Sequence, residues 1–169
     1  AKRCDSMTER DDGLTHLDAE GRAQMVDVSD KDVTVRRAVA IGYIIMNAET
    51  LDRIVSGQTP KGDPIKVAEL AGIMAGKKTS NLIPLCHPIP GVSVQVSMEP
   101  DSSLPGIRAT AEAKVTSQTG VEMEALTAVT IALLTVYDMA KAIDRGMRIE
   151  GVHLTEKHGG RSGSWTAAD

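Results

Sequence analysis

Apolar and polar residues alternate along four segments of the chain, and this period predicts four strands that each bury one face. The segments are residues 33–46, 92–98, 107–115 and 147–154. Arg37 interrupts the first alternation, and Gly151 interrupts the last, where we expect a bulge. The second and third segments are separated by EPDSSLPG, which has the composition of a turn.

Three further segments carry apolar residues at helical spacing. They are residues 48–56, 64–78 and 120–144. The first ends before Gly57, a residue that often terminates helices, and the second repeats its apolar positions through Val67, Leu70, Ala71 and Met74. The proline-rich segment 81–90 cannot form a regular element.

The longest predicted helix carries no charged residue between Glu124 and Asp138. Such a helix is expected to be covered on more than one face. Its uncharged run is shorter than the ~20 residues needed to cross a bilayer, so we do not expect it to span a membrane. Thr119 and Glu122 have the spacing of a capping box, which gives Glu122 a structural explanation.

The order strand, two helices, strand, strand, long helix, strand predicts an α+β fold. It resembles the ferredoxin-like split βαβ pattern, with an antiparallel sheet and one extra helix. Residues 1–13 are densely charged and lack any period, so we expect a disordered leader followed by a single domain over residues 14–169.

Composition narrows the function classes. The chain has no Phe, two Tyr and one Trp, so its core must be aliphatic, and oligomerisation would add buried area. A net charge of -4 argues against a nucleic-acid-binding protein. The two cysteines, Cys4 and Cys86, give no disulfide framework, and no signal peptide is recognisable. A cytoplasmic protein is expected.

The loop LIPLCHPIP holds Cys86 and His87 between prolines, which stiffen the backbone and present both side chains. Such a loop suits a binding pocket in which His87 contacts phosphate or base. A rigid crossover with His87 bonded to backbone is the structural alternative. A zinc site is a third interpretation, although CxxC pairs and HExxH are absent.

Charged residues at the two ends of the long helix are further candidates for catalysis or ligand binding. Glu124 lies in the first turn, either solvated or in contact with a ligand. Asp138 and Lys141 are three residues apart and therefore on one face. They form either a surface ion pair or a carboxylate that orients a lysine for proton transfer.

Two segments combine glycine with cations, a composition that suits phosphate binding. They are TPKGD, with Lys61, and EKHGGRSG, with Lys157, His158 and Arg161. Neither matches a Walker loop, and flexible tails have a similar composition.

Seven motifs of the chain occur in the order and spacing of the cyclic pyranopterin monophosphate synthase family, molybdenum cofactor biosynthesis protein C. The motifs are MVDVS, PKGD, AGIMAGKKT, LIPLCHP, TGVEMEALTA, LTVYDMAKA and KHGGRSG. The resemblance covers about residues 14–165. Arg161 replaces a common Lys and Lys78 a common Arg, and both substitutions keep the charge.

The resemblance implies a lyase with ferredoxin-like subunits, assembled as a homohexamer of three dimers with sites at subunit interfaces. Its substrate would be 3′,8-cyclised 7,8-dihydro-GTP, supplied by the upstream radical GTP cyclase. Its products would be cyclic pyranopterin monophosphate and pyrophosphate. No redox cofactor and no metal ligand is implied, and a magnesium requirement does not follow from the sequence.

The resemblance also implies residue roles. Asp138 matches the active-site residue, and Lys61 and Lys141 match the general acid and base candidates. The substrate site would be lined by Leu85, Cys86, His87, Met123 and Glu124. Further pocket positions would be Asp27, Arg36, Glu122 and Lys157.

Two other functions stay open: a non-catalytic ferredoxin-like module that binds a small molecule, and a metal-dependent hydrolase using Cys86, His87 and the glutamates. Helix geometry bears on the lyase interpretation, in which sites lie at subunit interfaces. Glu124 and Asp138 are fourteen residues apart, or ~21 Å along a helix. They either bracket an extended ligand or face different subunits, and we expect Lys61 of one chain to serve a site that contains Asp138 of another.

Overall fold

The computed structural model describes residues 22, 25, 29, 31–161 and 163–168. The predicted leader, residues 1–13, lies outside the described residues. The elements are β1 (Thr34–Ile45), α1 (Ala48–Val55), α2 (Pro64–Gly76), α3 (Thr79–Leu82), β2 (Ser93–Asp101), β3 (Gly106–Ser117), α4 (Glu122–Ala140), β4 (Arg148–His158) and β5 (Trp165–Thr166).

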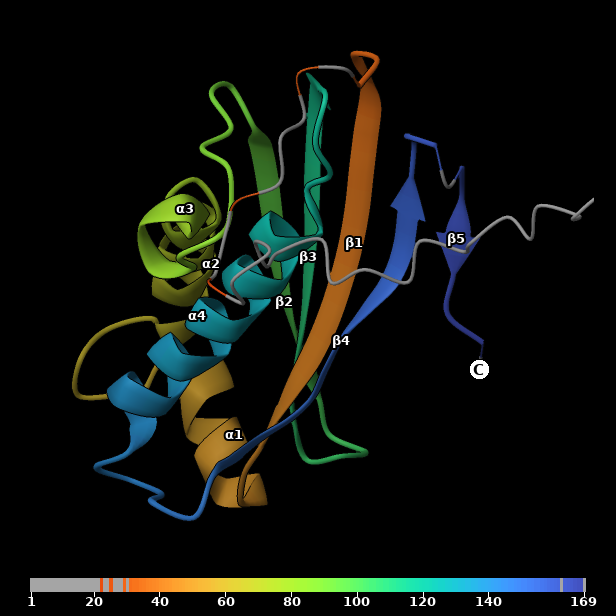
Figure 1. Cartoon of the computed structure of the whole chain (residues 1–169). Coiled ribbons are helices and arrows are strands. Elements are labelled where there is room, and N and C mark those ends of the chain that lie inside the picture. Colours follow the sequence, from red (N-terminus) through yellow and green to blue (C-terminus); the bar gives the residue numbers. More distant parts are fainter. Residues whose placement is uncertain (1–21, 23–24, 26–28, 30, 162, 169) are drawn as a thin grey trace, which may run out of the picture.

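The five strands form one sheet in the order β2-β3-β1-β4-β5, and all neighbours pair antiparallel. The helices lie together on one side of this sheet (Figure 1). The first four strands have the order of the ferredoxin-like split βαβ pattern, which confirms the predicted α+β fold. The short helix α3 and the edge strand β5 were not predicted.

The centre of the sheet is lined by alanine on the side that faces α4. Ala38 and Ala40 of β1 and Ala109 and Ala111 of β3 are completely buried. At Gly42, an added Cβ would lie 2.8–2.9 Å from side-chain atoms of β4 and α4, so only glycine permits this close approach. Small residues thus bring the helix close to the sheet, and the core forms without phenylalanine.

Helix α2 turns its large apolar residues outward. Val67, Leu70 and Met74 are 44%, 59% and 51% exposed, while the buried positions include Gly72 and Gly76. The cause is the packing against α4, where a Cβ at Gly72 would lie 2.8 Å from a backbone oxygen. The apolar spacing predicted the helix correctly, but this apolar face lies on the surface of the single chain.

The strands contain the predicted bulge, and β2 and β4 extend beyond their predicted ends. The bulge at Gly151 is confirmed by a φ of 63° and by a register shift against β1 between Ile41 and Tyr43. β4 runs past residue 154 to His158, so part of the predicted glycine-rich loop is a strand. β2 continues through Pro100, which an edge strand tolerates.

Helix α4 is long and apolar enough to span a membrane by length and composition. A core helix of a folded domain has the same properties. Ala125, Ala128, Val129, Ala132 and Leu133 are completely buried within the domain, so packing accounts for the apolar composition of α4.

Candidate active site

The C-terminal end of α4 brings together Lys61, Asp138 and Lys141, which we call the lysine–aspartate cluster. Nζ of Lys61 lies 2.9 Å from Oδ2 of Asp138, and Nζ of Lys141 lies 2.5 Å from Oδ1. Lys61 also donates to the backbone oxygen of Asp138 at 3.2 Å. The expectation that Lys61 serves the Asp138 of another chain is therefore wrong, because one chain supplies both residues.

The loop between α1 and α2 lies beside the last turns of α4 (Figure 1). Its Lys61 reaches Asp138 in the last turn of that helix. Gly62 has a φ of 92°, a conformation that favours glycine, and the Thr59 hydroxyl donates to its carbonyl. Asp63 then caps α2 by accepting from the backbone N–H groups of Ile65 and Lys66 at 3.0 and 3.2 Å. These bonds fix the loop on both sides of Lys61.

The lysine–aspartate cluster is electrostatically tight but open to solvent. Hydrogen bonds from Lys141 and Lys61 lower the pKa of Asp138 to about 2, so the carboxylate is ionised throughout the neutral range. About half of each side chain is exposed, at 49%, 53% and 52% for Lys61, Asp138 and Lys141. Ion pairs this exposed contribute little to stability, so stability gives little reason for the arrangement. Two ammonium groups held by one carboxylate can donate protons or stabilise developing negative charge.

A cavity of about 410 Å³ lies at the opposite end of α4, and we call it the cationic cavity. Its lining residues are Lys31, Asp32, Thr34, Arg36, Gln118, Thr119, Gly120, Glu122, Lys157, Gly160 and Arg161. Four of them are cations and two are carboxylates. An excess of positive charge in a concave site suits a phosphorylated ligand.

Arg36 of β1 is held in the cationic cavity by backbone groups. Its guanidinium donates to the carbonyls of Ser117 and Gln118, both at 3.3 Å. Gly159 and Gly160 have φ values of 94° and 79°, and a Cβ at Gly160 would lie 1.8 Å from Nη1 of Arg36. The paired glycines of the KHGG motif therefore make room for the guanidinium.

Glu122 and Lys157 form an ion pair at the edge of the cationic cavity, with Nζ 2.9 Å from Oε1. Burial acts to raise the pKa of Glu122, but the hydrogen bond and charge of Lys157 outweigh it, and the pKa lies below its usual value. The predicted capping box is wrong. Val121 occupies the N-cap position, and the N–H of Thr119 donates instead to the Ser117 hydroxyl at 3.3 Å.

Glu124, on the next face of α4, is a buried carboxyl group with only 4% of its surface exposed. Burial raises its pKa to about 7, and the charge of Glu122 adds to the shift. Cys86 lies within its electrostatic reach. Burial raises the pKa of the Cys86 thiol, and Glu124 raises it further. Glu124 can therefore hold or release a proton near neutral pH, whereas the thiol stays protonated.

The remaining predicted site residues are Leu85, His87, Met123 and Asp27. Leu85 and His87 are half-buried in the irregular segment after α3, and Met123 is 37% exposed at the start of α4. Asp27 lies outside the described residues. The predicted site residues therefore gather at the two ends of α4, and the helix keeps the ends ~21 Å apart.

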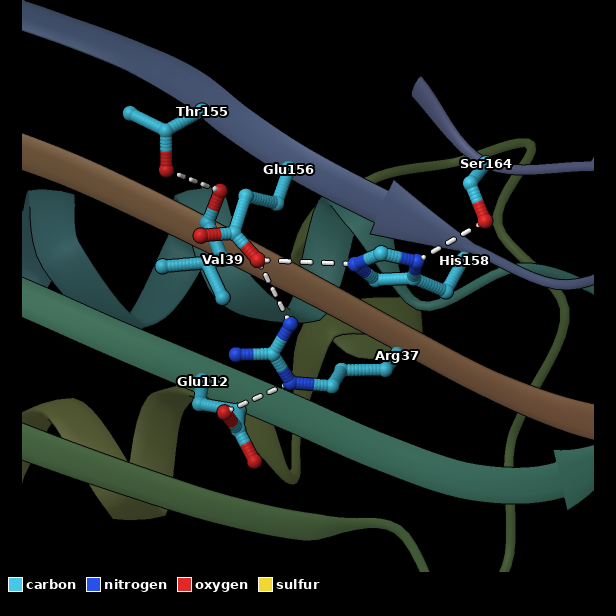
Figure 2. Close-up of polar contacts among 7 residues, drawn as sticks. All are labelled: Arg37, Val39, Glu112, Thr155, Glu156, His158 and Ser164. Carbon is cyan, nitrogen blue, oxygen red and sulfur yellow. Dashed lines mark hydrogen bonds and ion pairs between the residues drawn. The ribbon is translucent and has the colours of Figure 1, made fainter. Parts of the chain in front are cut away.

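Sequence analysis missed a polar network on the uncovered face of the sheet, drawn in Figure 2. Arg37 binds Glu112 at 2.8 Å and Glu156 at 2.6 Å. Nε2 of His158 lies 3.4 Å from Glu156, and Nδ1 lies 2.9 Å from the Ser164 hydroxyl. The partners come from β1, β3, β4 and the residue before β5, so only the strand register could have revealed the network.

Among the described residues, no group of three or more His, Cys, Asp or Glu side chains is placed to hold a metal ion. The charged groups of the lysine–aspartate cluster and the cationic cavity are lysines, arginines and carboxylates.

Known proteins resemble this chain over most of its length. The MoaC family matches residues 25–160. A cyclic pyranopterin monophosphate synthase of Methylobacterium sp. (strain 4-46) is 64% identical over 154 residues, which cover 91% of this chain and 96% of that protein. Proteins of the same name from Nostoc sp. and Dinoroseobacter shibae are 57% and 56% identical, covering 90% and 92% of this chain and 90% and 98% of their own lengths.

Proposed function

The chain belongs to the MoaC family, and we propose that the lysine–aspartate cluster and the cationic cavity carry out its reaction together. The enzyme is a lyase of molybdenum cofactor biosynthesis. It converts 3′,8-cyclised 7,8-dihydro-GTP to cyclic pyranopterin monophosphate and releases pyrophosphate.

The observation that carries the assignment of catalytic residues is the meeting of Lys61, Asp138 and Lys141. The two lysines come from positions 80 residues apart in number and converge on one carboxylate within 2.9 Å. Opening the imidazole ring of a purine and closing a pterin ring requires several proton transfers. Lys61 and Lys141 serve as the general acid and base, and Asp138 orients them.

The cationic cavity takes the triphosphate. Formation of the cyclic phosphate requires a hydroxyl of the sugar-derived part to attack the α-phosphorus. The bond from the α-phosphorus to the bridging oxygen breaks, and pyrophosphate leaves with that oxygen. Arg36, Lys157 and Arg161 line the cavity and offset the negative charge that develops on the departing group.

Buried Glu124 and half-buried Cys86, with Leu85, His87 and Met123, contact the rest of the substrate beside the cationic cavity. Glu124 exchanges a proton near neutral pH, which suits a ring-closure step. No redox cofactor takes part, because the rearrangement leaves the overall oxidation state unchanged.

Two chains contribute to each working site. The rigid helix α4 separates the lysine–aspartate cluster from the cationic cavity, so a compact substrate cannot reach both within one chain. The exposed apolar face of α2, with Val67, Leu70 and Met74, supplies an area for association, and Leu134 of α4 is also 50% exposed. A homohexamer built as a trimer of dimers places the C-terminal end of one α4 beside the cavity of a neighbour.

The enzyme works in the cytoplasm and receives its substrate from a radical GTP cyclase that acts before it. The chemistry of the substrate defines the preceding reaction, because the substrate forms only when C8 of the purine is linked to C3′ of the ribose.

The test is incubation of the purified protein with 3′,8-cyclised 7,8-dihydro-GTP. Stoichiometric release of pyrophosphate with cyclic pyranopterin monophosphate, identified by mass spectrometry, is expected, and chelator treatment should not abolish it. Saturable binding without product would instead establish a non-catalytic binding module. Loss of turnover on chelation, restored by a metal ion, would establish metal-dependent chemistry.

A further inference from the structure

A second cavity, of about 520 Å³, adjoins the cationic cavity and is lined by Glu122, Leu154, Lys157, Ser164 and Trp165. We propose that Trp165 is an aromatic platform on which the fused-ring part of the substrate stacks. The inference rests on the proposed function, because it assigns a subsite for the ring system of the same ligand.

Trp165 occupies this place because β5 pairs with the end of β4. Trp165 lies opposite Lys157 in the antiparallel register, so both side chains project to the same face of the sheet. Lys157 in turn pairs with Ala38, whose side chain is completely buried on the face covered by α4. The indole therefore lies on the helix side of the sheet, near the start of α4.

The network on the opposite face holds β5 in position (Figure 2). Nε2 of His158 lies 3.4 Å from the Glu156 carboxylate. Nδ1 of the same ring forms a hydrogen bond of 2.9 Å with the Ser164 hydroxyl. A backbone bond from Ala167 to Thr155 at 2.8 Å adds a second anchor. The residue before Trp165 and the residues after it are thus both fixed to β4.

The two cavities share Glu122 and Lys157, which makes them neighbouring parts of one surface. The cationic cavity suits a polyphosphate, whereas the second cavity has Leu154 and Trp165 in its lining and suits a flat apolar ring. A nucleoside triphosphate has these two parts covalently joined. Trp165 is 45% exposed, so part of its indole is accessible to a ligand.

Because the chain has one tryptophan, its fluorescence reports on this cavity without any substitution. We expect GTP to quench the emission saturably, because the guanine ring stacks on the indole. Inorganic triphosphate should bind competitively with GTP and leave most of the emission unchanged. Binding of GTP without quenching, or equal quenching by inorganic triphosphate, would overturn the proposal.

Turnover of the cyclised substrate supplies the second readout. Trp165→Ala should raise KM about tenfold and change kcat less than about threefold, because base–aromatic stacking contributes to binding. Trp165→Phe should restore most of the affinity. Leu104→Ala, at an exposed position in the turn between β2 and β3, is the matched control and should leave both constants unchanged.

An unchanged KM in folded Trp165→Ala would refute the stacking role while leaving the proposed function intact. Wild-type protein that releases no pyrophosphate would refute the proposed function, and the GTP quenching experiment would still decide the role of Trp165.

Discussion

The two ends of helix α4 each carry a carboxyl group, and the two groups differ in exposure and in the direction of their pKa shifts. At the C-terminal end, Asp138 is half-exposed, its pKa is lowered to about 2, and two lysines compensate it. At the N-terminal end, Glu124 is buried and its pKa is raised to about 7. The first arrangement keeps a carboxylate ionised beside two cations, whereas the second creates a group that titrates near neutral pH.

The largest expected effect concerns the C-terminal end. Lys141→Ala should reduce kcat by at least ~100-fold without loss of fold, because it removes one of the two proposed proton-transfer groups. Lys66→Ala is a matched control, since Lys66 also lies three residues after an aspartate and pairs with it at 3.6 Å. Steady-state kinetics on the cyclised substrate should show a wild-type rate for the control. Equal rates for both variants would mean that the lysine–aspartate cluster is a surface ion pair without a catalytic role.

The N-terminal end is tested by the pH dependence of stability. The folded pKa of Glu124 is about 7 and its ordinary value is 4.5, so the folded chain binds a proton that the unfolded chain releases. This contribution to the free energy of unfolding is fully present below the ordinary pKa and is lost as pH rises towards the folded pKa. The loss amounts to at most ~3 kcal/mol.

Glu124→Gln should remove that dependence, because the amide is neutral at every pH. Denaturant unfolding should find the variant more stable than wild type above the folded pKa and similar to it in acid. Glu99→Gln, at an exposed position of β2, controls for the loss of one carboxylate. Parallel stability curves for wild type and Glu124→Gln would mean that burial does not shift this pKa.

A smaller effect is expected in the cationic cavity. Lys157→Ala should raise KM about tenfold and lower kcat less, because one charge-assisted contact to phosphate is lost. Lys114→Ala removes an exposed cation from β3 and should have no effect. The difference between the variants should shrink as salt concentration increases. A selective loss of kcat in Lys157→Ala would place this lysine in the chemistry and not in phosphate binding.

Local patterns predicted the fold well because its main strands and helices follow simple periods. The alternation from Val33 to Ile45 and the break at Gly151 both appear in the sheet. The orientation of α2 was beyond such patterns. Gly72 must pack against α4, so Leu70 faces outward, and a helical period cannot show which of two apolar faces a neighbour covers.

The site was predictable where its contacts are local. Asp138 and Lys141 are one helical turn apart, so their pairing follows from spacing. Lys61 joins them across 77 positions, which required the fold. Glu122 fitted a capping box, but its carboxylate binds Lys157 of β4 instead, and that strand extends beyond its predicted end. The position of Trp165 could not be predicted from local patterns, because it depends on the pairing of β5 with β4.

In the proposed assembly, the two ends of α4 meet across different chains. This arrangement is tested most directly by mixing the Asp138→Ala enzyme with the Arg36→Ala/Lys157→Ala double variant under conditions that exchange subunits. Random assembly should restore about a quarter of the wild-type activity, because that share of sites draws both intact halves. A mixture of Lys61→Ala and Asp138→Ala should stay inactive, since one chain supplies both residues. Demonstrated subunit exchange without recovery in the first mixture would contradict the shared site.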